Sequence, residues 1–139
     1  MCVVLFVPVM MLVAVAPLPP VADDAKLLQG AWTIVSYTYR GKKAPEDKLS
    51  NMSCVIKENT LSIEEDKRVE SGTIKLDPTK KPKTLDLIIK DGAKTETALF
   101  IYELDGDNLK LCWSKPGGER PTAFSAEGTD GYMVLKRKK

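Results

Sequence analysis

After its N-terminal portion, the chain is a succession of short segments in which apolar and polar side chains alternate. An alternation with a period of two is typical of a β-strand that buries one face. The segment 84–90 shows the pattern well, because Leu85, Leu87 and Ile89 share one face, opposite Asp86. Turn-forming residues separate the segments. The predicted strands are 31–40, 52–57, 60–65, 69–76, 84–90, 95–104, 108–114 and 132–137.

The short connections restrict how these strands can pair. Asp91-Gly92 and the Asp-Gly-Asp at 105–107 are strong hairpin signals, and consecutive strands joined by such turns pair antiparallel. A closed up-and-down barrel buries one face of every strand and leaves no free edge. We therefore expect an all-β fold, an eight-stranded antiparallel barrel, with a two-sheet sandwich as the alternative. One short N-terminal helical turn is expected at 25–29, capped by Asp23 or Asp24, and a short helix after the first strand at 45–49.

The chain divides at residue 22. Residues 2–15 are almost wholly apolar, a run shorter than the about 20 residues that span a bilayer. Small residues around Ala16 and Ala22 suit a cleavage site, so we expect 1–22 to be a signal peptide or apolar leader. No Lys or Arg precedes the run, which leaves a retained weak anchor as the alternative. The expected protein is exported (periplasmic, cell-envelope or extracellular) and has no stable membrane span after cleavage. Residues 23–139 are one domain by size.

Composition excludes several kinds of chemistry. The chain contains no histidine, which removes Ser-His-Asp and Cys-His catalysis and histidine-based metal binding. A net charge of +2, with acids and bases interspersed, argues against a nucleic-acid partner. The basic run 136–139 is interpreted as a solvated tail, with an anion or membrane-surface contact as the alternative, and the Asp-Gly-Asp at 105–107 is explained as hairpin chemistry. We therefore predict no enzyme activity, no cofactor and no metal site.

The two cysteines of the predicted domain lie on opposite faces of their strands. Cys54 shares its phase with Met52 and Ile56, which point inward, whereas Cys112 lies between Leu111 and Trp113 and points outward. A disulfide needs a short separation between its β-carbons, so the strand phase argues against a bridge. A β-bulge would reverse that phase, and the pairing stays open.

Six large side chains are expected to point into the barrel. An eight-stranded barrel is just wide enough to be filled by its own side chains or to hold one small ligand. The same residues are therefore either a packed core or the lining of an apolar ligand pocket. These lumen candidates are Ile74, Leu87, Ile89, Phe100, Tyr102 and Trp113.

Several segments together resemble an uncharacterised lipocalin-like domain family of exported bacterial proteins, most abundant in planctomycetes. The resemblance lies in 28–32 (LQGAW), 41–43 (GKK), 72–83 (GTIKLDPTKKPK), 101–112 (IYELDGDNLKLC) and 119–122 (ERPT). It implies a lipocalin-like barrel and brings no established activity, ligand or catalytic residue. In such barrels a basic side chain of the last strand covers the opening tryptophan. The implied barrel floor is therefore Gly30 and Trp32, with Lys136 or Arg137 stacked on the indole.

These observations lead to one expected function and two alternatives. The first is a non-enzymatic, exported lipocalin-like barrel that binds a small apolar or amphipathic ligand. The second is a protein-interaction or cell-envelope module with a filled core, whose recognition surface is formed by the loops 78–83 and 115–121. The third, an enzyme, needs a buried carboxylate or lysine with a perturbed pKa, for which Glu65 is the one candidate. The sequence names neither a ligand nor a protein partner.

Overall fold

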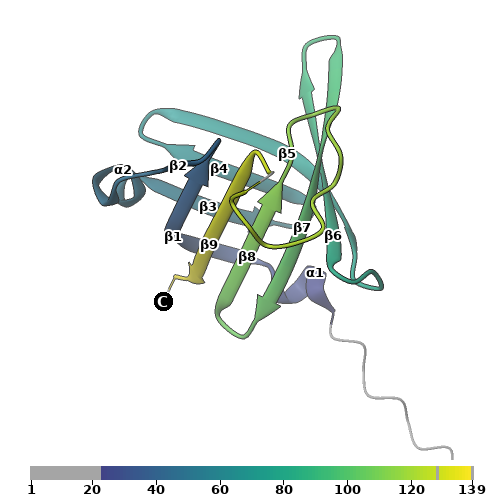
Figure 1. Ribbon diagram of the computed structural model, residues 1–139, viewed down its shortest axis with the longest axis horizontal. Helices are drawn as coiled ribbons and strands as arrows, with labels where there is room; N and C mark the ends of the chain where they lie inside the picture. Colours follow the sequence, from purple (N-terminus) through teal and green to yellow (C-terminus); the bar gives the residue numbers. More distant parts are fainter. Residues whose placement is uncertain (1–22, 128, 139) are drawn as a thin grey trace, which may run out of the picture.

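In the computed structural model, which describes residues 23–127 and 129–138, eight antiparallel strands close into an up-and-down barrel (Figure 1). Consecutive strands are neighbours, and the first barrel strand also pairs with the last, which closes the sheet. The predicted barrel is confirmed, and the sandwich alternative is wrong. The predicted leader, 1–22, lies outside the described residues. The barrel strands are β1 (Gly30–Tyr39), β3 (Met52–Lys57), β4 (Thr60–Glu65), β5 (Arg68–Asp77), β6 (Lys83–Asp91), β7 (Lys94–Asp105), β8 (Asn108–Trp113) and β9 (Gly131–Arg137).

Three short elements differ in detail from the sequence expectation. Between the first predicted strand and the predicted helix lies a two-residue strand, β2 (Lys42–Lys43), which pairs with the end of β1. Helix α2 (Glu46–Ser50) follows Pro45 and lies close to the predicted helix at 45–49. Helix α1 (Asp24–Leu27) starts after Asp23, but no side-chain hydrogen bond caps it. None of the described helices is long and apolar enough to cross a membrane.

A β-bulge in β1 turns Tyr37, rather than Ser36, towards the interior. Ile34 pairs with Leu135, but two residues later the register has shifted, so that Tyr37 pairs with Met133. The extra residue of a bulge turns the following side chains to the opposite face. Val35 is consequently exposed at the bulge, while Tyr37 packs against the core.

The interior of the barrel is filled by one contiguous cluster of buried side chains. All eight barrel strands contribute to it, and they are joined by Leu28, at the end of α1, and by Leu49 of α2. Trp32, Leu85 and Leu135 are fully buried. Figure 1 shows α1 across the lower end of the barrel, which we call the floor. The opposite end, the mouth, lies where Tyr39, Gly131 and Trp113 pair across the strands.

One part of the barrel wall is also covered on its outer face. Ile101 and Cys112 alternate with the inward residues of β7 and β8, yet they are 1% and 0% exposed. The segment 114–127 crosses in front of these strands and covers them (Figure 1). The loop 115–121 was expected to form part of a recognition surface. It belongs to this covering segment because the outward apolar side chains need burial.

Cys54 and Cys112 are free and buried. Cys54 lies in the interior cluster, whereas the Cys112 thiol contacts the carbonyl of Ser125 in the covering segment, at 3.5 Å. They therefore lie on opposite faces of the wall, and the opposite strand phases inferred from the sequence account for the absence of a bridge.

Candidate functional site

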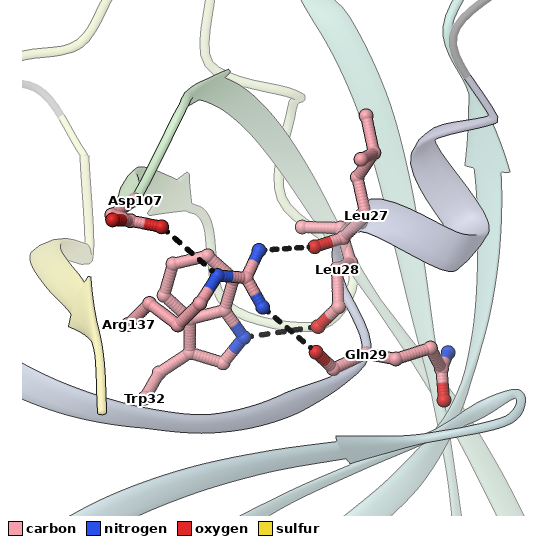
Figure 2. A network of polar contacts seen from close by, with 6 residues as sticks. All are labelled: Leu27, Leu28, Gln29, Trp32, Asp107 and Arg137. Carbon is pink, nitrogen blue, oxygen red and sulfur yellow. Dashed lines mark hydrogen bonds and ion pairs between the residues drawn. The ribbon is translucent and has the colours of Figure 1, made fainter. Parts of the chain in front are cut away.

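The floor of the barrel is built around Trp32 (Figure 2). Its indole Nε1 donates a hydrogen bond to the carbonyl of Leu28, at 2.9 Å. The guanidinium of Arg137 lies over the ring, 4.4 Å from its centroid, in cation–π geometry. Arg137, rather than Lys136, takes this place, because Lys136 is one residue out of phase and exposed.

Arg137 also joins three segments of the chain. Its guanidinium donates to the carbonyls of Gln29, at 3.0 Å, and Leu27, at 2.5 Å. Its Nε contacts the carboxylate of Asp107 in the β7–β8 turn, at 3.2 Å. Gly30, with φ +119, places the chain so that a β-carbon there would lie 3.7 Å from the guanidinium. The floor is therefore held closed by contacts within the chain (Figure 2).

A charged cluster that the sequence analysis missed lies beside this floor. The Asp24 side chain is 3% exposed, and its Oδ2 accepts hydrogen bonds from Lys83, at 2.9 Å, and Tyr102, at 2.8 Å. Burial, followed by the bond to Asp24, raises the pKa of the Tyr102 hydroxyl, which therefore stays protonated and donates. The strand phase could have placed Lys83 on the inward face, because Lys83 lies two residues before the inward Leu85.

The six lumen candidates contact the core to different degrees. Ile74, Phe100 and Tyr102 are buried in the interior cluster, and Leu87 and Trp113 pack against it, partly buried. Ile89 is also partly buried, nearer the β6–β7 turn, and is not a member of the cluster. The candidates therefore bury much of their apolar surface against other protein side chains.

Towards the mouth, aromatic rings stack across the interior. The ring centroids of Phe100 and Trp113 are 5.1 Å apart, and those of Trp113 and Tyr37 are 5.9 Å apart. Burial raises the pKa of Tyr37 to about 12, so its hydroxyl is neutral. Glu65, the one acid expected inside the barrel, forms an ion pair with Lys48 at 3.3 Å and is 37% exposed. It is therefore a solvated, paired carboxylate.

A groove lies on the outer face of the barrel. Its volume is about 560 Å³. It lies over the floor-side halves of β5, β6 and β7, between the loop 78–83 and the covering segment. The two loops expected to form a recognition surface therefore meet here. The lining residues are Lys75, Leu76, Asp77, Lys80, Lys81, Pro82, Thr84, Asp86, Ile101, Arg120, Pro121 and Thr122.

The groove has one fixed wall. Arg120 Nη2 pairs with the carboxylate of Asp86 at 2.5 Å, and its Nη1 donates to the carbonyl of Phe100 at 2.8 Å. Pro121, the next residue, is also buried. These contacts hold the covering segment on the outer face and keep the groove open between it and the loop 78–83.

The acids of the groove are engaged by neighbouring residues. Asp86 lies opposite Lys75 in the β5–β6 register, in addition to its pair with Arg120. Asp77 accepts hydrogen bonds from the hydroxyl and the backbone N–H of Thr79, which lower the pKa of its carboxyl. Since four basic and two acidic side chains line the groove, its surroundings are net positive.

In the part of the chain that the structure describes, His, Cys, Asp and Glu side chains form no group of three or more able to hold a metal ion. Comparison with known proteins found no matching family model, curated protein or solved structure. The candidate site is therefore inferred from the geometry of this structure alone.

Proposed function

We propose that this protein is a non-enzymatic binding module, and that it binds a small amphipathic ligand in the groove on the outer face of the barrel. The observation that carries the proposal is the groove itself. Its volume of about 560 Å³ falls within the range of about 300–1,000 Å³ typical of small-molecule sites. Its lining combines four apolar side chains with six charged ones and two threonines, which suits a ligand with both an apolar and a charged part.

The packing inside the barrel favours the outer groove, rather than the lumen, as the location of the ligand site. The interior cluster draws on all eight barrel strands, and the Phe100–Trp113–Tyr37 stack continues it towards the mouth. Opening a lumen site would require these contacts to separate. We propose that the barrel is a scaffold with a filled core, and that residues 1–22 direct its export.

The side-chain chemistry supports a binding role rather than catalysis. The chain has no histidine. Burial raises the pKa of Tyr37 and of Cys54, each to about 12, and raises that of Tyr102, so these groups stay protonated at neutral pH. A catalytic base or nucleophile needs the opposite adjustment.

Backbone-amide NMR of the full chain tests the location of the site. Decanoate and decanol, kept below micelle-forming concentrations, serve as probes. At least one of them is expected to shift the amide signals of the groove residues Lys75, Thr84 and Thr122. Shifts confined to interior residues such as Cys54 and Met133 would instead place the site in the lumen.

Variants that fill the groove with a large side chain provide a second test of the site. Thr84 lines the groove, so Thr84→Trp is expected to abolish binding of the probe. Thr97→Trp, at an exposed outward position of β7 away from the groove, is the matched control and should bind as the original chain does. Thr122→Trp, at an exposed lining position, blocks the groove without altering a strand. Saturable binding that survives in both blocking variants contradicts the proposal.

A further inference from the structure

The arrangement of charge in the groove points to the class of its ligand. We propose that the groove selects a free organic anion, a carboxylate at the end of a short apolar body, and that Lys80 and Lys81 hold the anionic end. This inference rests on the proposed function, because it concerns the same groove.

The two acids of the groove are each engaged by neighbouring groups of the chain. Asp86 lies between Lys75, its cross-strand partner, and Arg120, its ion-pair partner. Asp77 is bound by Thr79. Lys75 and Lys80 also favour the ionised form of Asp77, which lowers the pKa of that carboxyl further.

Lys80 and Lys81 provide the surplus positive charge. Both are exposed, and across residues 23–127 and 129–138 neither has a carboxylate partner within the 4.0 Å of an ion pair. Lys83, the next lysine, is directed to Asp24 at the floor instead. A ligand carboxylate would therefore complete the charge balance at this end of the groove.

An apolar path leads away from these lysines. Pro82 follows Lys81 directly, and Thr84 lies beside Ile101 in the β6–β7 register. Pro121 bounds the same path from the covering segment. Beyond it lies the Arg120–Asp86 pair, whose charges satisfy each other. The groove thus has a cationic end and an apolar middle, which matches a ligand with one charged end.

Three probes with the same ten-carbon chain test the charge preference: decanoate, decanol and decyltrimethylammonium. Affinities are measured from the shifts of the groove amides, again below micelle-forming concentrations. We expect decanoate to bind most tightly and decyltrimethylammonium most weakly. Decanoate binding should also weaken as salt is added, because exposed charges are screened.

Charge-reversal variants test the two lysines. Lys80→Glu combined with Lys81→Glu is expected to weaken decanoate binding by about tenfold, since each exposed ion pair contributes a modest amount. The matched control is Lys90→Glu combined with Lys94→Glu. It makes the same change in net charge at exposed positions beside the β6–β7 turn and should leave the affinity nearly unchanged.

The outcomes separate this inference from the proposed function. Equal affinity for decanol and decanoate in the groove overturns the anion preference but leaves the binding function standing. Equal losses in the two charge-reversal variants also overturn it, because the effect would then be one of net charge. If no probe shifts the groove amides, both proposals fall. Binding to phosphatidylglycerol vesicles without binding to monomeric decanoate overturns the choice of a free ligand.

Discussion

The indole of Trp113 lies directly against the backbone of Gly131, its cross-strand neighbour. A β-carbon on Gly131 would be 2.2 Å from two atoms of the ring, a distance that requires the ring or the strand to move. The absent side chain leaves room for the ring to reach Tyr37 on one side and Phe100 on the other. Gly131 therefore determines how the barrel is filled near its mouth.

Gly131→Ala is expected to destabilise the protein by about 1–3 kcal/mol, the usual cost of an overpacked core. Urea unfolding measures the change, and near-ultraviolet circular dichroism reports the displaced indole. In a Trp113→Leu background the same substitution should cost much less, because the clashing ring is gone. Equal costs in the two backgrounds would show that the indole contact is not the cause.

Asp24→Asn is expected to destabilise the floor by about 1–3 kcal/mol. The buried carboxylate accepts from both Lys83 and Tyr102, whereas an amide that keeps both contacts loses the charge that pairs with Lys83. Urea unfolding gives the total cost, and amide hydrogen exchange should rise first in α1. Asp23→Asn, at the exposed neighbouring position, is the control and should change stability little. Similar effects of the two substitutions would remove the special role of Asp24.

Strand phase made the barrel predictable from the sequence. The segments 52–57 and 60–65 match β3 and β4 residue for residue, and the strand at 84–90 differs from β6 by one residue at each end. Alternation and turn residues are local signals, so a single sequence is sufficient to read them. The same phase placed Cys54 and Cys112 on opposite faces of the wall.

The candidate site was less predictable because it depends on non-local contacts. The loops 78–83 and 115–121 were expected to form a recognition surface, but nothing local in the sequence shows that Arg120 reaches Asp86. The bulge at Val35 is equally hidden, since it is a shift relative to β9. Asp24 was expected as a helix cap, yet its side chain turns into the floor to meet Lys83 and Tyr102.

Arg137→Lys is expected to cost about 1–3 kcal/mol, although it keeps the positive charge. Lysine lacks the planar fork with which Arg137 reaches the carbonyls of Leu27 and Gln29 while covering Trp32. Urea unfolding is the measurement. The control is Lys136→Arg, at the exposed neighbouring position, which should be nearly neutral. A cost for R137K no larger than that of the control would show that charge alone serves the floor.

The buried thiol of Cys54 makes the free energy of unfolding decrease as the pH rises into the alkaline range. Burial raises its pKa from 9.0 to about 12. Because the folded pKa lies above the unfolded one, the contribution is fully present below about pH 9 and is lost as the pH rises towards 12. Between pH 8 and 10 this thiol should account for a loss of about 1 kcal/mol in the free energy of unfolding.

Urea unfolding of the original chain and of Cys54→Ala at a series of pH values measures this contribution. The alanine variant is expected to be less stable at pH 7, because it leaves a cavity in the core. Its stability should nevertheless fall less steeply between pH 8 and 10, since it has no thiol at residue 54 to ionise on unfolding. Peptide mapping should also show that iodoacetamide alkylates Cys54 slowly in the native protein at pH 8 and rapidly in urea. Parallel pH profiles together with rapid native alkylation would mean that the thiol is accessible and its pKa unshifted.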